Sequence, residues 1–271
     1  MTRYLMAVIC TLFGYCIDAS ASSLTSKTWI NNADEITEEW LVDAGAESGY
    51  TEHIRHFKIL FNSMSVRTFL EFGVGFSTKY FIDNSENVVS VEFITPGSGP
   101  EWLQYCINLY TACPTWKPIA YFSGNGLNTS WATYKYMGKE SVYKACAYQP
   151  VYYKSYALID PSFLSDLNNF INMQVAANPV DVAFIDAGVC IRGDLVQSLF
   201  NKVPIIAAHD IAPIAIRKLN DVYGYGRVVV PSNYVEIYVP FGMGTAFWVL
   251  NIDAYQEIII SLQEYANGVE P

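Results

Sequence analysis

Acidic side chains stand close to the ends of several predicted strands, where they could line a ligand site. Glu71, Glu92 and Asp186 each close or nearly close an apolar run, and His209-Asp210 closes another. The carboxyl ends of parallel strands meet at one edge of a sheet, so we expect these side chains to converge. Carboxylates and an imidazole at such an edge could orient a hydroxyl and accept its proton. A carboxylate pair could also hold Mg²⁺, which prefers oxygen ligands.

A pair of glycines, Gly73 and Gly75, follows the first of these strands. Glycines permit a sharp turn from strand to helix and close approach of a ligand to the backbone. Glu92, nineteen residues after Gly73, is suitably placed to accept hydrogen bonds from two ribose hydroxyls. A dinucleotide site would need a third glycine near its pyrophosphate, and here the carboxylate of Glu71 would repel that group. The turn therefore favours a nucleoside ligand with a cationic part.

The elements that must position these residues alternate between strands and helices. The predicted strands of this part are Val66–Phe72, Val88–Phe93, Pro118–Phe122, Val180–Asp186 and Val203–Ala208. The predicted helices between them are Thr78–Asp83, Glu101–Ala112, Ser162–Ala177 and Gly193–Asn201. This alternation predicts βαβ units, and hence an α/β fold with a mostly parallel, Rossmann-like sheet covered by helices on both faces.

The C-terminal part breaks the alternation. Two β-rich runs, Tyr234–Pro240 and Thr245–Asn251, are joined by a glycine-containing turn, which predicts a hairpin. A last helix is expected over Ala254–Ala266. The sheet should therefore have seven strands and end in an antiparallel pair.

The segment before the first strand predicts two helices, Asp34–Asp43 and Tyr50–Asn62. His53 and His56 stand three residues apart on the second, a spacing that permits metal binding, although a solvated helix face is the favoured interpretation. Arg192, near the fourth strand, is expected to pair with a neighbouring acid rather than to bind substrate.

The N-terminus has the layout of a secretory leader. Arg3 precedes an apolar run over residues 4–17, and Ala19-Ser20-Ala21 supplies small residues before a cleavage site. We expect export to a secretory, periplasmic or luminal compartment with cleavage after Ala21; an uncleaved anchor is the alternative. Residues 22–49 then form a helical N-terminal extension, and residues 50–271 form one domain. A tyrosine-rich insertion at about 123–159 could act as a lid or as a structural cover.

Composition limits the partners. The net charge is −10 and no basic cluster is present, which argues against nucleic acid as a ligand. No second segment is apolar for long enough to span a membrane, and nothing indicates an oligomeric state. Four cysteines remain after the leader, so three disulfide pairings are conceivable. Cys106 and Cys113 would lie about 10 Å apart in one helix, too far for a bridge.

Several of these segments resemble the motifs of class I S-adenosylmethionine-dependent methyltransferases. LEFGVGFST at residues 70–78 resembles their first motif, and VSVE at residues 89–92, followed by Trp102, resembles their second. DVAFIDAG at residues 181–188, with Arg192 beyond it, resembles their fourth. PIIAAHD at residues 204–210 is similar to the fifth strand of small-molecule and sugar O-methyltransferases. The resemblance covers roughly residues 50 to 252.

The resemblance implies a role for each candidate residue. The cofactor, S-adenosylmethionine, would contact Glu71, Gly73, Gly75, Ser77, Glu92 and Asp186. The catalytic residues facing a small-molecule or sugar hydroxyl would be Asp186, His209 and Asp210. Either His209 takes the hydroxyl proton, or Mg²⁺ held by Asp186 and Asp210 lowers the pKa of the hydroxyl.

Two other functions remain open. S-adenosylmethionine is made in the cytosol, so an exported chain with this fold could be a non-catalytic binding protein on a methyltransferase-like scaffold. An enzyme that uses a nicotinamide nucleotide is the other alternative.

Overall fold

The computed structural model describes residues 30–48, 51–93, 99–121, 161–187, 191–211, 213 and 223–268. The predicted leader and the tyrosine-rich insertion lie outside these residues, as do Cys146 and Cys190. Export, the domain boundaries and the role of the insertion therefore stay predictions.

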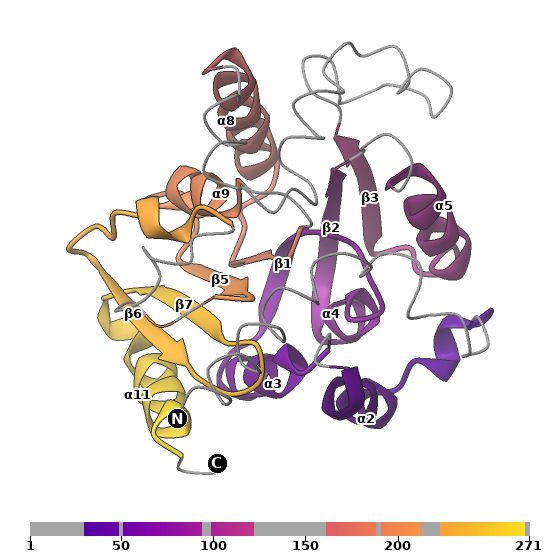
Figure 1. Ribbon diagram of the computed structural model, residues 1–271, viewed down its shortest axis with the longest axis horizontal. Coiled ribbons are helices and arrows are strands. Elements are labelled where there is room, and N and C mark those ends of the chain that lie inside the picture. The colour runs from indigo at the N-terminus through magenta and orange to yellow at the C-terminus, as the bar shows by residue number, and fades with distance from the viewer. Residues whose placement is uncertain are drawn as a thin grey trace, which may run out of the picture.

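The described chain is built on one seven-stranded sheet in the order β3-β2-β1-β4-β5-β7-β6 (Figure 1). Neighbouring strands from β3 to β5 are parallel, whereas β7 runs antiparallel to both β5 and β6. The strands are β1 (Val66–Phe72), β2 (Ser85–Phe93), β3 (Trp116–Tyr121), β4 (Val182–Ile185), β5 (Ile205–His209), β6 (Tyr234–Val239) and β7 (Thr245–Leu250).

The predicted fold class is confirmed, including the antiparallel pair at the end of the sheet. The largest difference in a strand boundary is at β2, which begins at Ser85 rather than Val88. The polar residues Ser85 and Asn87 pair with β1 in the register Val66↔Ser85 and Thr68↔Asn87. An apolar pattern cannot reveal this extension, because the pairing there uses backbone groups and the side chains are exposed or half-buried.

Helices cover both faces of the sheet, and each face has its own apolar core. Helices α8 (Pro161–Ala177) and α9 (Arg192–Leu199) pack on one face, against alternate residues such as Leu70 and Ile185. The other face is covered by α2 (Glu38–Ser48), α3 (His53–Ser63), α4 (Thr78–Asn84), α5 (Gly99–Leu109) and α11 (Gln256–Ala266). Short 3₁₀ helices occupy Ala33–Glu35, Tyr225–Arg227 and Asp253–Tyr255.

The expectation of a solvated helix face for His53 and His56 is wrong. Both side chains are buried, at 0% and 1% exposure. Helix α3 packs on the sheet beside α11, so His53 contacts Phe184 of β4 while His56 contacts Tyr265 of α11. The pattern failed because α3 is enclosed on more than one side, and a helix of that kind has little solvated face.

Cys106 and Cys113 are free cysteines, and Cys113 lies beyond the end of α5 at Leu109. No helix in the described part of the chain is long and apolar enough to cross a membrane.

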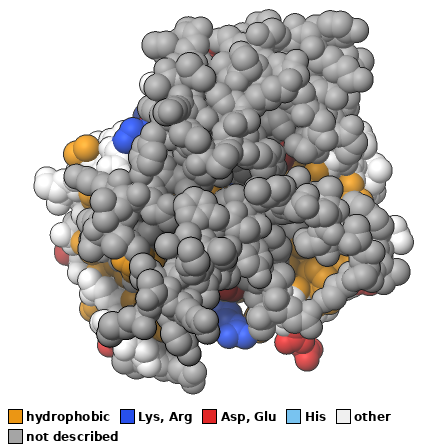
Figure 2. Space-filling model, in the orientation of Figure 1, with side chains coloured by type: hydrophobic (Ala, Val, Ile, Leu, Met, Phe, Trp, Pro, Cys, Tyr) orange, Lys and Arg blue, Asp and Glu red, His pale blue; other side chains and the backbone are white. Residues whose placement is uncertain are grey.

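In the view of Figure 2, the charged side chains of the described residues lie at separate places along the margin, beside larger apolar areas.

An aromatic cluster under β1, β4 and β7 fixes α3 on the sheet. Phe57 has no exposed surface, and its ring centroid lies 4.8 Å from that of Phe184 and 5.1 Å from that of Phe81. Phe69 and Phe247 each lie 5.6 Å away. Edge-to-face contacts of this kind add to the free energy of burial.

We therefore expect Phe57→Ala to lower the free energy of unfolding by about 3–5 kcal/mol, because neighbouring rings cannot fill the cavity. Urea unfolding at neutral pH measures the change. Phe241→Ala is the control, since Phe241 is 41% exposed and should cost far less. Equal losses for the two variants would contradict the assigned role of the cluster.

Candidate functional site

The turn after β1 requires glycine at its first position. Gly73 has φ +100°, and its N–H donates to the carbonyl of Val91 at 2.9 Å. A Cβ at this position would lie 2.7 Å from the carbonyl oxygen of Asp186. Only glycine lets the turn pass this close to the end of β4, and so bring the two strand ends together.

Gly75, in contrast, faces open space. No heavy atom among the described residues lies within 4 Å of the position that a Cβ would occupy. Its N–H donates to Oγ1 of Thr78 at 2.9 Å, and that hydroxyl donates to Oε2 of Glu71 at 2.8 Å. The indole of Trp102 and the hydroxyl of Tyr110 donate to the carbonyls of Val74 and Gly75. The turn is thus held from its inner side and open on its outer side.

Glu71 lies beneath the turn with no exposed surface. Its Oε2 also accepts from the hydroxyl of Ser90 at 2.7 Å, and Trp116 donates to that hydroxyl. Oε1 is buried and has no hydrogen-bond partner among the described residues. Burial raises the pKa of Glu71 to about 8, although the hydrogen bonds from Ser90 and Thr78 act in the opposite direction. As placed, Glu71 stabilises the turn instead of presenting an oxygen at the surface.

Glu92, at the end of β2, is half-buried beside the same turn. Its Oε2 accepts from the N–H of Val74 at 3.0 Å, and its Oε1 has no partner among the described residues. Burial raises the pKa of Glu92 to about 8, and the nearby carboxylate of Asp186 adds to the rise. Ser77, also predicted to contact the cofactor, lies on the turn just before α4 and is 8% exposed.

A buried arginine joins the ends of β4 and β5. Nη1 of Arg192 lies 3.1 Å from Oδ1 of Asp186 and 3.2 Å from Oδ2 of Asp210. The guanidinium also donates to the carbonyls of Ala187 and His209, and it lies 3.8 Å from the ring centroid of Tyr223. Arg192 pairs with neighbouring acids, as predicted. Its pairing also occupies the space between the two carboxylates that were candidates for Mg²⁺.

His209 lies among three carboxylates. Its Nδ1 is 3.5 Å from Asp186 and 3.6 Å from Asp210, and its Nε2 is 3.5 Å from Glu52. Burial alone would lower its pKa, but the carboxylates outweigh that effect and raise the pKa of His209 to about 10. His209 is therefore protonated at neutral pH, and in this state it holds a proton and cannot accept one. Arg192 and His209 together hold the pKa of Asp186 well below its usual range, against the opposing effect of burial.

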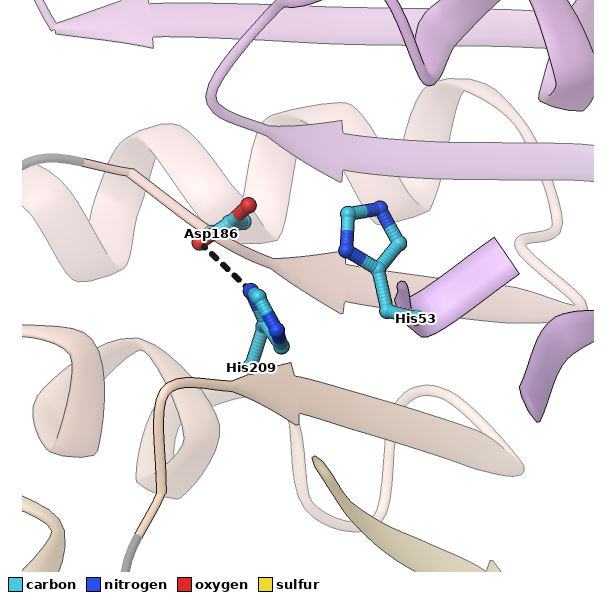
Figure 3. A group of neighbouring side chains, drawn as sticks. All are labelled: His53, Asp186 and His209. Carbon is cyan, nitrogen blue, oxygen red and sulfur yellow. Dashed lines mark ion pairs between the residues drawn. The ribbon is translucent and has the colours of Figure 1, made fainter. Parts of the chain in front are cut away.

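Sequence reasoning missed Glu52 in this group and expected His53 on a solvated helix face. Glu52 precedes α3, and its carboxylate accepts from the N–H of Met243 in the β6–β7 turn while facing His209. His53 directs its ring toward Asp186 and His209 (Figure 3), with its centroid 4.7 Å from that of His209. Burial lowers the pKa of His53 well below its usual value, and His209 adds to this, so the ring is neutral. Neither residue belongs to a strand end, so the strand-end rule could not find them.

The structure thus gathers all the predicted site residues at one edge of the sheet, in two halves. Around β1 and β2 lie Glu71, Gly73, Gly75, Ser77 and Glu92. Around β4 and β5 lie Asp186, His209 and Asp210. The halves meet where the N–H of Asp186 donates to the carbonyl of Phe72 at 2.8 Å.

No family model matches the chain, and no curated protein matches it. Among solved structures, an O-methyltransferase from Bacillus cereus in complex with SAH is similar, with a TM-score of 0.46 and 12% identity over 88% of this chain and 99% of that one. The SAH-bound methyltransferase PaMTH1 from Podospora anserina is also similar, with a TM-score of 0.43 and 14% identity over 86% of this chain and 93% of that one. At such low TM-scores and identities, these structures carry no argument about the function of this chain.

The raised pKa of Glu71 makes a prediction about stability. A carboxyl group with a pKa of about 8 in the folded state and an ordinary value when unfolded costs increasing stability as pH rises through that interval. Glu71→Gln removes this titrating group. As pH rises through the interval, the free energy of unfolding of the variant should therefore increase relative to that of the wild type by up to about 1.4 kcal/mol per pH unit. Urea unfolding of both proteins from pH 5 to 8 tests this. A constant difference across the range would show that Glu71 is ionised throughout.

The contacts of Arg192 lead to a second prediction about stability. Arg192→Met removes the buried guanidinium that Asp186 and Asp210 share and leaves two backbone carbonyls without their donor, so we expect the free energy of unfolding to fall by about 3–5 kcal/mol. Arg227→Met is the matched control, because Arg227 pairs with Asp194 at the surface and such pairs contribute about 0–1 kcal/mol. Denaturant titrations at neutral pH compare the two. A loss no larger than that of the control would refute a structural role for the buried pair.

Proposed function

We propose that this chain is an S-adenosylmethionine-dependent methyltransferase that acts on a hydroxyl of a small molecule or sugar. The observation that carries the proposal is the turn between β1 and α4. Gly75 is open to a ligand there, Glu92 offers a carboxyl oxygen beside it, and Glu71 has an unsatisfied oxygen beneath it. This set of groups suits a nucleoside with a cationic part.

The residues around the turn fit the cofactor's chemistry. Glu92 would accept hydrogen bonds from the ribose hydroxyls, and Gly73 and Gly75 would allow the ligand to approach the backbone. A cationic ligand would lower the raised pKa of Glu71 and so favour its ionised form, whose buried oxygen would stabilise the positive charge through space. A pyrophosphate would instead raise that pKa and gain no attraction from Glu71, which weighs against a nicotinamide nucleotide. When bound, S-adenosylmethionine supplies an activated methyl group.

On the acceptor side, the partly exposed carboxylates of Asp186 and Asp210 are the groups that would meet a hydroxyl. Their side chains are 23% and 24% exposed, whereas that of His209 is 2% exposed. The carboxylates would accept the hydroxyl hydrogen bond and align the oxygen for in-line transfer. As the oxygen–methyl bond forms and the carbon–sulfur bond breaks, the hydroxyl proton would pass to the partly exposed carboxylate of Asp210 and from there to water. His209 then acts from behind, as a proton-bearing group that orients Asp186 and Asp210.

Mg²⁺ between Asp186 and Asp210 would have to displace the guanidinium of Arg192, which lies within 3.2 Å of both carboxylates. The described residues therefore favour a metal-free acceptor site at this position. Export of the mature chain beginning at Ser22 stays part of the proposal, and it would require a supply of the cofactor outside the cytosol.

Calorimetric titration with S-adenosylhomocysteine tests the cofactor site. We expect the chain to bind it with micromolar affinity and Glu92→Ala to weaken binding by about tenfold or more, since the hydrogen bonds to the two ribose hydroxyls are lost. Glu86→Ala is the matched control, because Glu86 lies on the same strand but is exposed at its other end.

The alternatives give different results in the same experiment. Absence of binding by a folded wild-type protein, with magnesium present, would reject the methyltransferase proposal and favour a binding protein on this scaffold. Enhanced fluorescence of added NADH, without binding of S-adenosylhomocysteine, would favour a nicotinamide enzyme.

A further inference from the structure

His53 is a polar side chain with nothing polar to bind. It has no exposed surface, and neither Nδ1 nor Nε2 has a hydrogen-bond partner in the described part of the chain. The surrounding rings of Phe57, Phe81 and Phe184 would accommodate an apolar side chain equally well. A buried imidazole without partners is costly, so its presence calls for an explanation.

The ring of His53 is aimed at two groups that can donate to a metal ion. Ligand atoms of His53, Asp186 and His209 all lie within 4.8 Å of one another. The three come from separate elements, namely the start of α3, the end of β4 and the end of β5, and they converge in Figure 3. Ligands of a tetrahedral ion at about 2.1 Å lie about 3.4 Å apart, so small side-chain rotations would complete the site.

The charge around this group also favours a cation. With both histidines neutral, the carboxylates of Asp186, Asp210 and Glu52 face a single guanidinium, that of Arg192. A divalent ion would balance the excess negative charge. It would replace the proton of His209, which serves the same purpose in the structure without an ion.

We propose that His53, Asp186 and His209 bind a divalent transition-metal ion. Two imidazole nitrogens and one carboxylate oxygen form a ligand set suited to Zn²⁺, Fe²⁺ or Co²⁺, unlike the all-oxygen set that Mg²⁺ prefers. The site differs from the Asp186–Asp210 pair because the imidazoles of His53 and His209 take the place of the Asp210 carboxylate as ligands of the ion. It does not depend on the proposed methyl transfer.

Titration of the full, untagged and chelator-treated chain with Co²⁺ tests the site through the visible absorption of the bound ion. We expect one ion per chain, and His53→Phe should bind at least about 100-fold more weakly, since even loss of an outer-shell partner costs 10–100-fold. His56→Phe is the matched control, because His56 is equally buried on the same helix but bonds to Thr245. Circular dichroism verifies that each variant is folded.

X-ray absorption on the wild-type cobalt form gives a result that needs no variant. A first shell with two imidazole nitrogens supports the proposal, and a shell of oxygen atoms alone overturns it. Failure of the wild type to bind Co²⁺ or Zn²⁺, or unchanged binding by His53→Phe, overturns it as well. Titration with S-adenosylhomocysteine, performed separately with metal absent, keeps the outcome for the cofactor site distinguishable.

Discussion

The edge of the sheet depends on the buried guanidinium of Arg192. An acid follows each of the strands β4 and β5, and the like charges of Asp186 and Asp210 would repel each other. Arg192 places one nitrogen between them and satisfies the carbonyls of Ala187 and His209. Because a guanidinium stays charged at all relevant pH values, the cation of this arrangement does not titrate, whereas a histidine in its place would.

Carboxyl groups at the two halves of the site behave in opposite ways, and the cause is the set of partners of each. Around β1 and β2 the partners are neutral hydroxyls and backbone N–H groups, so burial dominates and Glu71 and Glu92 tend to keep a proton. Around β4 and β5 the partners are cations, so Asp186 stays ionised despite burial. A single edge thus presents a nearly neutral half beside a charged half.

The sequence was sufficient to predict the elements and the residues at strand ends. Apolar runs identify β1 to its exact bounds and the hairpin β6–β7 to within one residue at its ends, because buried strands must be apolar and turns need glycine. The rule that ligands bind at the carboxyl ends of parallel strands then placed Glu92 and Asp186 at the same edge. These inferences use only local pattern and one topological rule.

What could not be predicted depends on contacts between distant segments. Glu52 and His53 belong to a helix that precedes the sheet, and only the packing of α3 beneath β4 and β5 brings them to His209. The local pattern around His53 and His56 indicated a solvent-facing side, since no sequence window reveals that α11, two hundred residues later, covers it. The same contacts decide whether His209 is a base. An isolated imidazole could accept a proton at neutral pH, whereas the three carboxylates around His209 keep it protonated and therefore an acid. The chemistry of such a group is therefore a property of the assembled edge, and a residue type at a strand end specifies only where that chemistry takes place.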